Sequence, residues 1–388
     1  MSLAARQDRD ERLPPLLAAV REQVDAQRRH AAEGDGLRPV WSEHVSRVVE
    51  EVAGVHCEDE GEVLYAGTLS RGCRACKDGT WDCIFLTLAC NLNCAFCFSP
   101  KLPRDYVGST FGNTPEEIAA NHGRTRIEGI SFSGGEPFLQ PEKLFSWLEW
   151  FKRVEPDKYY WVYTNGLLVE PAHLTRLGQL GLDEIRFNAA ASSYASPPLL
   201  ETMAQAARVI PNVTVEIPAI PEHAPRLLAA LAPWEKAGVR FLNLHELLYE
   251  PGTNAASLPR PRRAFLAADG HRTHVHPGSR ALTLAVMKKV HEDGLALSVN
   301  DCSLQGKLRQ LRGRRCSLAP LVKQPYEKLV DDTLESCCAY LGAECRLFHP
   351  DSLEAERQAH PGYRFARLAR IAPLYANDSG RWISLQAL

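Results

Sequence analysis

Short β-forming runs alternate with helical runs from residue 83 onward, and this alternation limits the possible folds more than any other feature. Pro opens most of the helical segments and Gly follows most of them, as at helix starts and stops. Repeated strand–helix units give a parallel sheet with right-handed crossovers. The expected strands are residues 83–89, 129–134, 159–165, 184–190, 213–220, 240–247 and 295–300. We therefore predict an α/β fold with a partial or full (β/α) barrel, and an open doubly wound sheet is the alternative.

The rest of the chain is organised around this core. Residues 248–278 form a Pro-rich and His-rich insertion between two of the expected strands. The expected parts are a helical N-terminal extension (1–56), a cysteine-containing lead-in (57–82), the barrel core (83–302) and a cysteine-rich C-terminal extension (303–388). An apolar fraction of 45% excludes intrinsic disorder of the whole chain.

The densest chemical signal is Cys90-Asn-Leu-Asn-Cys94-Ala-Phe96-Cys97, directly after the first expected strand. Parallel α/β folds bind their ligands at the carboxyl ends of the strands, so this loop lies where a site forms. Three thiolates from one loop can converge on one metal centre, and thiolates select zinc or iron–sulfur clusters. Three protein ligands leave a fourth position open, which is typical of a catalytic centre rather than a structural one.

The CxxxCxxC spacing, with an aromatic residue before the third Cys, resembles the radical SAM superfamily. The resemblance implies that Cys90, Cys94 and Cys97 hold a 4Fe-4S cluster whose open iron binds S-adenosyl-L-methionine (SAM). It also implies that the backbone of Phe96 lies against the adenine. Reductive cleavage of SAM would then give a 5′-deoxyadenosyl radical that abstracts a hydrogen atom from a substrate. Because the cluster must be reduced by one electron, the resemblance further implies a flavodoxin or ferredoxin partner.

A second motif, Gly134-Gly135-Glu136-Pro137, ends the next expected strand and is similar to the GGEP motif of the same family. In the family this motif binds the methionyl amine. Two glycines allow the backbone to approach a ligand closely, and Glu136 can accept charge-assisted hydrogen bonds from an ammonium. A simple strand-end turn is the alternative, but the position one strand after the cysteine loop favours the functional interpretation.

Three polar residues at later strands are further candidates for cofactor binding. Asn165 lies in a TNG sequence that resembles the third strand of many relatives. Asn188 and Glu216 lie on the fourth and fifth strands, where relatives place groups that contact the ribose. A capping or turn-forming role is the alternative for each of them. The sequence indicates no catalytic side chain beyond these groups.

The remaining cysteines fall into a group before the barrel and a group at the C-terminal end. Cys73 and Cys76 form a CxxC pair that can supply half of a metal site. The C-terminal group can bind an auxiliary cluster or zinc, and buried thiols, a redox pair or a substrate-binding thiol are the alternatives. The candidates for auxiliary metal binding are Cys73, Cys76, Cys302, Cys316, Cys337 and Cys345.

Charge and hydropathy argue against two classes of partner. The formal net charge of −2 argues against bulk nucleic-acid binding, which is typical of basic domains. No apolar run approaches the ~18 residues that a membrane span needs, and the first residues lack the core of a signal peptide. We therefore expect a cytoplasmic protein, in a compartment where disulfides are rare.

The predicted function is that of a radical SAM enzyme acting on an unidentified small molecule, peptide or RNA. Short segments such as GCRAC, DEIRFNAA and VEIPAIPE also resemble archaeal radical SAM proteins described as pyruvate formate-lyase activating enzyme-like. One alternative is therefore a glycyl-radical-type activase that acts on a partner protein. The other alternative is a non-catalytic zinc or iron–sulfur module.

Overall fold

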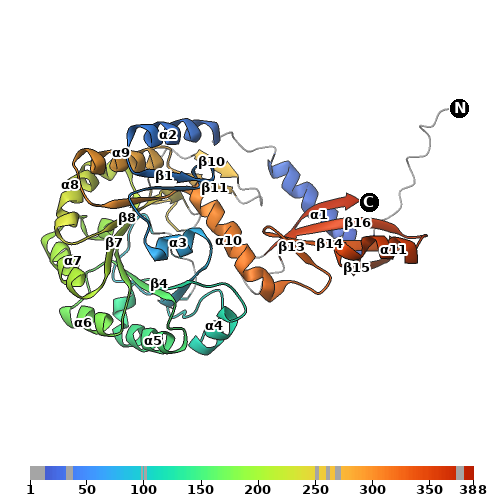
Figure 1. Ribbon diagram of the computed structural model, residues 1–388, viewed down its shortest axis with the longest axis horizontal. Helices are drawn as coiled ribbons and strands as arrows, with labels where there is room; N and C mark the ends of the chain where they lie inside the picture. The colour runs from blue at the N-terminus through green and yellow to red at the C-terminus, as the bar shows by residue number, and fades with distance from the viewer. Residues whose placement is uncertain are drawn as a thin grey trace. The chain divides into compact units, whose positions relative to one another are not determined.

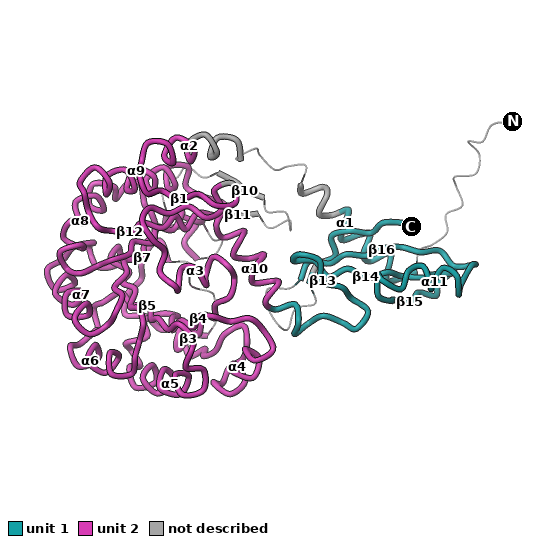
Figure 2. The backbone as a smooth tube through the Cα atoms, viewed as in Figure 1, with its two compact units in different colours: residues 1–34, 268–271, 318–388 teal, residues 35–267, 272–317 magenta. Residues whose placement is uncertain are grey.

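The structure is a computed structural model (Figure 1). It describes residues 14–31, 38–97, 99, 103–249, 253–258, 263–266, 272–372 and 380–388. The chain divides into two compact units (Figure 2). The larger comprises residues 35–267 and 272–317, and the smaller comprises residues 1–34, 268–271 and 318–388.

Seven parallel strands form the core of the larger unit within the described residues. They are β3 (Trp81–Thr87), β4 (Gly129–Gly134), β5 (Tyr159–Thr164), β6 (Glu184–Phe187), β7 (Asn212–Ala219), β8 (Phe241–Glu246) and β12 (Ser298–Cys302). Each strand pairs with the next in chain order. A doubly wound sheet reverses its strand order at a switch point, and this order does not reverse. The predicted α/β fold and its seven strands are confirmed, and the sheet curves as a partial barrel.

Helices cover the outer face of this sheet (Figure 1). Proline stands in the first turn of α4 through α7, as predicted, and the Thr114 side chain caps α4 by accepting a hydrogen bond from the backbone of Glu117. Beneath them lie fully buried apolar side chains of the strands, such as Phe132 and Val162. The helices of this layer are α4 (Pro115–His122), α5 (Pro141–Val154), α6 (Pro171–Gln179), α7 (Pro197–Val209), α8 (Ala224–Lys236) and α9 (Ser279–Glu292). A further helix, α10 (Leu304–Val322), follows β12 and is not part of this outer layer (Figure 1).

The residues predicted as a separate lead-in complete the barrel unit instead. The hairpin of β1 (Val55–Glu58) and β2 (Val63–Ala66) extends the sheet, because β2 pairs antiparallel with β12. The next helix, α3 (Arg71–Lys77), lies inside the curve of the strands (Figure 1). Its Cys73 Sγ lies 3.2 Å from Asn243 Oδ1 on the inner face of β8. These contacts tie residues 57–82 to the barrel more closely than the sequence indicated.

The insertion and the smaller unit are built from antiparallel strands. In the insertion, β9 (Leu248–Tyr249), β10 (Arg263–Leu266) and β11 (Arg272–Val275) pair in the order β10-β11-β9. The smaller unit contains α1 (Pro15–Ala31), β13 (Lys328–Val330), β14 (Thr333–Leu341), β15 (Glu344–Phe348), α11 (Leu353–Ala359), β16 (Arg364–Ile371) and β17 (Arg381–Ala387).

The N-terminal extension predicted over residues 1–56 is divided between the two units. Helix α1 packs Leu17 and Val20 against Cys338 and Leu368 of the smaller sheet. The second helix, α2 (Arg38–Glu51), belongs to the barrel unit. In the part of the chain that the structure describes, no helix combines the length and the apolar content that a bilayer span needs.

A buried ion-pair network joins the first strand of the barrel to its neighbouring helices. His122 of α4 places Nε2 3.2 Å from Asp82 Oδ2 of β3 and Nδ1 2.9 Å from Glu155 Oε2. Arg314 of α10 reaches the other carboxylate oxygen of Asp82 at 3.4 Å. Because the His122 and Asp82 side chains are completely buried, this network depends on the protonation of the histidine.

We expect the free energy of unfolding of the wild type to exceed that of the His122→Gln variant. The difference should be largest below pH 6.5. Burial by itself lowers the pKa of His122, but the hydrogen bonds to Asp82 and Glu155 outweigh it and raise the pKa above its ordinary 6.5. A raised pKa means that the protonated form stabilises the fold, so the difference is complete below 6.5 and is lost as the pH rises through the raised value. Urea unfolding between about pH 5 and pH 9 measures this difference. The exposed His291→Gln is the control, and a pH-independent difference for His122→Gln would contradict the argument.

Candidate active site

Most of the predicted site residues gather at the carboxyl ends of the parallel strands. The cysteine loop follows β3, the Gly134–Pro137 motif ends and follows β4, Asn165 follows β5 and Asn188 follows β6. Because the strands are parallel and run in unbroken order, these ends lie along one rim of the sheet. Glu216 lies within β7 and contacts residues of the inner face.

Three thiols lie on the loop after β3. Cys90 and Cys97 are exposed and Cys94 is half-buried. A turn is closed by the Cys97 N–H, which donates to the Cys94 carbonyl oxygen at 3.0 Å. Burial raises the pKa of the Cys94 thiol, and the charges of Cys97 and Cys90 raise it further.

The donor set of this loop fits a 4Fe-4S cluster. Its three side chains are thiols, the ligand class that iron–sulfur clusters take. The Leu92 N–H donates to Cys90 Sγ at 3.4 Å, and Asn165 Nδ2 lies 4.0 Å from the same sulfur. Hydrogen bonds to sulfur are one means by which a protein sets the potential of a cluster. In the described part of the chain no three Cys, His, Asp or Glu side chains already stand in a metal-ligating arrangement, so cluster binding must draw these thiols together.

The two glycines of the GGEP motif let the end of β4 cross close to the start of the cysteine loop. A Cβ on Gly135 would lie 1.9 Å from the carbonyl oxygen of Ala89, and a Cβ on Gly134 would lie 2.0 Å from that of Thr87. Two backbone hydrogen bonds cross here, from Gly135 N to Thr87 O at 2.7 Å and from Glu136 N to Ala89 O at 2.8 Å. The sequence predicts close approach to a ligand, and the structure shows close approach to the neighbouring backbone.

Glu136 is completely buried and its carboxylate joins neighbouring strand ends. Oε1 accepts hydrogen bonds from Thr164 Oγ1 at 2.8 Å and from Phe138 N at 3.1 Å, and Oε2 accepts one from Asn165 N at 2.8 Å. A carboxylate oxygen has two lone pairs, so Oε2 keeps one acceptor position for the predicted ammonium. Pro137 is buried beside it and opens a 3-10 turn.

Two asparagines at the rim have different surroundings. Asn165 Nδ2 donates to Asn91 Oδ1 at 2.7 Å and thereby ties the loop after β5 to the cysteine loop. Asn188 Oδ1 is buried and has no hydrogen-bond partner among the described residues. A buried acceptor without a donor costs roughly 1–3 kcal/mol, which a ligand that donates a hydrogen bond would recover. The hydroxyl groups of the SAM ribose are such donors, so this rim fits SAM.

Sequence reasoning missed Asn254, which holds the loop at Phe96. Asn254 is 1% exposed, and its Nδ2 donates to the Phe96 carbonyl at 3.1 Å and to the Leu248 carbonyl at 2.9 Å. The Phe96 side chain packs against Ile220, Leu247, Tyr249 and Leu258. No motif marks Asn254, and 158 residues separate it from Phe96, so only the fold brings the two together.

Sequence reasoning also missed a buried charge cluster on the inner face of the barrel. Arg186 bridges two carboxylates, with Nε 2.9 Å from Glu184 Oε1 and Nη1 2.8 Å from Glu216 Oε2. Burial by itself raises the pKa of Glu216, but Arg186 and the hydrogen bond from His245 outweigh it and lower the pKa to about 2. Glu216, predicted to contact the ribose, is therefore ionised and bound to Arg186, His245 and Asn243. Polar residues at alternate positions of β6, β7 and β8 were the sequence signal for this face.

The cysteines predicted as auxiliary metal ligands are divided between the two units. Cys73 and Cys76 lie on α3, Cys302 ends β12, and Cys316 lies on α10. Cys337 is buried in the smaller unit, where Cys345 forms a disulfide with Cys338. Among the described residues no three Cys, His, Asp or Glu side chains stand in a metal-ligating arrangement, and Cys345 is paired with Cys338, so the auxiliary site stays a prediction.

Burial keeps the thiols inside the barrel protonated. It raises the pKa of Cys73, whose thiol donates to Asn243 Oδ1, and it raises the pKa of Cys76 to about 12. Burial also raises the pKa of Cys302 well above its ordinary value.

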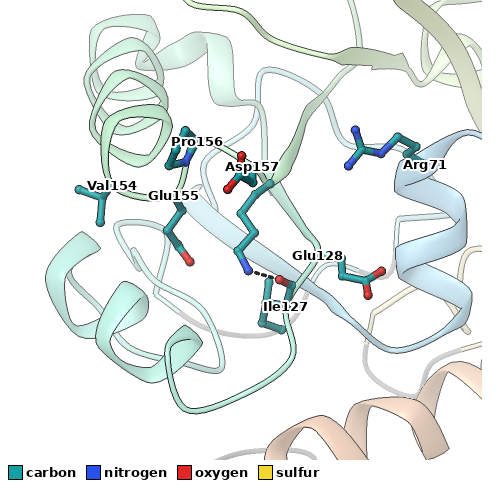
Figure 3. Close-up of a pocket in the computed structure, with 8 residues that line it drawn as sticks. Arg71, Ile127, Glu128, Val154, Glu155, Pro156 and Asp157 are labelled. Atoms are coloured by element: carbon teal, nitrogen blue, oxygen red, sulfur yellow. Dashed lines mark hydrogen bonds between the residues drawn. The ribbon is translucent and has the colours of Figure 1, made fainter.

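A pocket of the barrel unit lies at the opposite rim from the candidate site (Figure 3). Glu128 precedes β4 and Lys158 precedes β5, so the pocket lies at the amino ends of the strands. A hydrogen bond from Lys158 Nζ to the Ile127 carbonyl crosses it. The lining residues are Arg71, Ile127, Glu128, Val154, Glu155, Pro156, Asp157 and Lys158.

Part of the chain matches a known protein family. Residues 84–226 match the family model described as Radical SAM superfamily. A protein of Methanocaldococcus jannaschii, provisionally named a glycyl-radical enzyme activating enzyme, is 28% identical over 277 residues, which are 69% of this chain and 72% of the relative.

Two solved structures were also compared. SuiB of Streptococcus suis bound to SAM has a TM-score of 0.41 and 12% identity, covering 58% of this chain and 50% of SuiB. Methylornithine synthase (PylB) has a TM-score of 0.38 and 12% identity, covering 61% of this chain and 79% of PylB. The chain thus spans about half the length of SuiB. The match to the family model shows that the chain carries a radical SAM domain over residues 84–226, and this match and the relative above together indicate an enzyme.

Proposed function

We propose that this enzyme is an activase that takes a hydrogen atom from a glycyl residue of a partner protein. The observation that carries the proposal is the three-cysteine loop at the carboxyl rim of the barrel, beside the GGEP motif. The name of the relative from M. jannaschii supports the choice of a glycyl residue over a small molecule or RNA. The same proposal assigns Cys90, Cys94 and Cys97 as cluster ligands.

When bound, the cluster would supply one electron, and SAM would supply the group that takes a hydrogen atom from the glycyl Cα. The chain's own residues bind and orient these groups. Glu136 offers its remaining acceptor position to the methionyl ammonium, and Asn188 Oδ1 accepts from the ribose. Phe96 presents its backbone to the adenine, and Asn165 aligns the cysteine loop.

The reaction consumes one electron per SAM, so we also propose a flavodoxin or ferredoxin as electron donor. The exposure of Cys90 and Cys97 leaves the loop accessible to such a partner. The cytoplasmic location expected from the sequence stays a prediction.

The test is SAM cleavage by the anaerobically reconstituted full chain. We expect about four iron atoms per chain, a paramagnetic signal after reduction, and methionine and 5′-deoxyadenosine when SAM is added. A peptide carrying dideuterated glycine should transfer deuterium into the 5′-deoxyadenosine. Bound zinc with no SAM cleavage would instead support the non-catalytic module. SAM cleavage without deuterium from any glycyl peptide would overturn the activase while leaving the family assignment in place.

We expect Gly135→Ala to destabilise the barrel by roughly 1–3 kcal/mol and to weaken SAM binding. The added methyl group would meet the Ala89 carbonyl oxygen at 1.9 Å, so the backbone that aligns β4 with the cysteine loop must shift. Urea unfolding and the SAM-induced change in the signal of the reduced cluster measure the two effects. Gly362→Ala is the control, since a Cβ there meets nothing within 4 Å. Normal SAM affinity in Gly135→Ala would contradict the role of this crossing.

We expect Asn254→Ala to raise the KM for SAM about fivefold while changing kcat little, because one hydrogen bond that positions Phe96 is worth about 1 kcal/mol. The unanchored loop should also lose iron faster to a chelator. The control is Asn212→Ala, which removes hydrogen bonds to Tyr159 and Asp183 at the opposite rim. If both variants behave alike, Asn254 has only a structural role.

A further inference from the structure

Polar side chains of neighbouring strands form a row on the inner face of the barrel. Glu216 of β7 is in register with Asn243 of β8, and Asn243 is in register with Asn300 of β12. Side chains at alternate positions of a strand share a face, so His245 lies on the same face, two residues nearer the carboxyl rim than Asn243. Direct hydrogen bonds join Asn243 to both Glu216 and Asn300, at 2.9 and 3.1 Å.

Glu216 determines which nitrogen of His245 carries the proton. His245 Nε2 lies 2.7 Å from Glu216 Oε1. An ionised carboxylate only accepts hydrogen bonds, so Nε2 must be the protonated nitrogen and Nδ1 holds a free lone pair in the neutral ring. Burial lowers the pKa of His245, and the charges of Lys307 and Arg186 lower it further against the opposing effect of Glu216. The ring is therefore neutral near pH 7.

The lone pair on His245 Nδ1 is buried and has no hydrogen-bond partner among the described residues. Asn300 Oδ1, on the adjacent strand, is a second buried acceptor for which the described residues offer no donor. The Asn300 side chain is oriented by its Nδ2, which donates to Asn243 Oδ1 and lies 3.2 Å from Cys302 Sγ. Buried polar groups are nearly always hydrogen-bonded, so two unmatched acceptors on one inner face indicate a ligand that donates hydrogen bonds.

We propose that His245 Nδ1 and Asn300 Oδ1 bind main-chain N–H groups of the substrate peptide, which makes His245 a specificity-determining residue. This inference rests on the proposed function for the identity of the substrate. In a glycyl residue the amide N–H is one bond from the Cα that loses its hydrogen atom. Binding the N–H therefore positions the C–H bond, and a substrate without this donor leaves the acceptors unmatched.

Two matched peptides test the role of the glycyl N–H group, and both are used with the unaltered enzyme. One is acetyl-Ala-Gly-Ala-amide with dideuterated glycine, and the other carries N-methylglycine at the same position and so lacks that N–H. Binding to the unreduced holoenzyme is followed by saturation-transfer NMR, and turnover by deuterium in 5′-deoxyadenosine. We expect the glycine peptide to bind and the N-methyl peptide to bind at least about tenfold more weakly, the loss that one unmatched buried acceptor produces.

Two substitutions of His245 distinguish the roles of its two ring nitrogens. In His245→Gln the amide can keep the hydrogen bond to Glu216 but offers no acceptor in place of Nδ1. In His245→Asn the shorter amide places an acceptor near the Nδ1 position and loses the contact with Glu216. We expect His245→Gln to abolish the preference for the glycine peptide and His245→Asn to keep most of it.

The outcomes distinguish the two proposals. Equal binding of both peptides by the wild type, or an unchanged preference in His245→Gln, would overturn the role of His245. Binding of neither peptide would overturn it as well. If the binding preference is found but no deuterium is transferred, the activase function fails and the donor-binding site stands.

Discussion

Cys94→Ala should lose the cluster and all SAM cleavage while keeping its fold. Cys94 is the middle thiol of the loop, and two remaining thiols leave two corners of the cluster without a protein ligand. Its side chain lies on a loop beyond the end of β3 and is only half-buried, so its removal leaves the packed core of the barrel intact. Iron analysis, the visible absorption of the reconstituted protein and its paramagnetic signal after reduction all measure the loss.

The control for this result is Cys57→Ala. Cys57 is an exposed free cysteine on β1 and is not part of the loop. It should keep its full iron content and cleave SAM at the wild-type rate. Urea unfolding should show similar stability for both apo variants. Iron retention and normal turnover in Cys94→Ala would mean that other side chains hold the cluster, and the assignment of the loop would fall.

Arg186→Met should destabilise the protein by about 3–5 kcal/mol, the typical result of removing one partner from a buried ion pair. The Arg186 side chain is 2% exposed and neutralises Glu184, which is 0% exposed, and Glu216, which is 11% exposed. Without the guanidinium, two carboxylates remain in a poorly solvated barrel with no opposite charge between them. Urea unfolding at neutral pH measures the effect.

Two comparisons separate lost charge from lost packing at this position. In the triple variant Arg186→Met with Glu184→Gln and Glu216→Gln, no buried carboxylate remains unpaired, so much of the stability should return. Arg126→Ala removes a surface pair with Glu128, whose side chains are 76% and 44% exposed, and should change stability by less than about 1 kcal/mol. If the triple variant is no more stable than Arg186→Met, the loss of stability in Arg186→Met comes from lost packing and not from unpaired charge.

The strands of the barrel could be predicted because their signal is local. The run 159–165 predicted from Tyr-Tyr-Trp-Val-Tyr-Thr-Asn is β5, which ends at Thr164, one residue earlier. Its neighbour β4 has the predicted bounds 129–134, whereas β6, predicted over 184–190, ends at Phe187 and is followed by a 3-10 turn. These strands could be predicted because buried parallel strands are short apolar runs bounded by helix signals. By contrast α3, a seven-residue helix, was missed, because a helix this short has too little periodicity to stand out among glycines and charges.

The candidate site likewise contains residues that the sequence could reveal and residues that only the fold brings together. The cysteine loop and the GGEP motif could be found because their chemistry depends on residues a few positions apart. Asn254, Arg186 and His245 could not be found, because each acts through a partner on another element. The sequence predicted Glu216 as a cofactor-binding residue, whereas its partners Arg186 and His245 became visible only through the register of β6, β7 and β8.

The sequence by itself determined the order of strands and helices, the rim on which ligands bind and the thiols available to a cluster. These properties follow from spacing and periodicity, which act over a few residues. The tertiary structure decided which buried charges are neutralised, which lone pairs lack a donor, and which cysteines lie together. Those outcomes depend on contacts between residues far apart in the chain, and such contacts exist only once the strands have paired and the helices have packed.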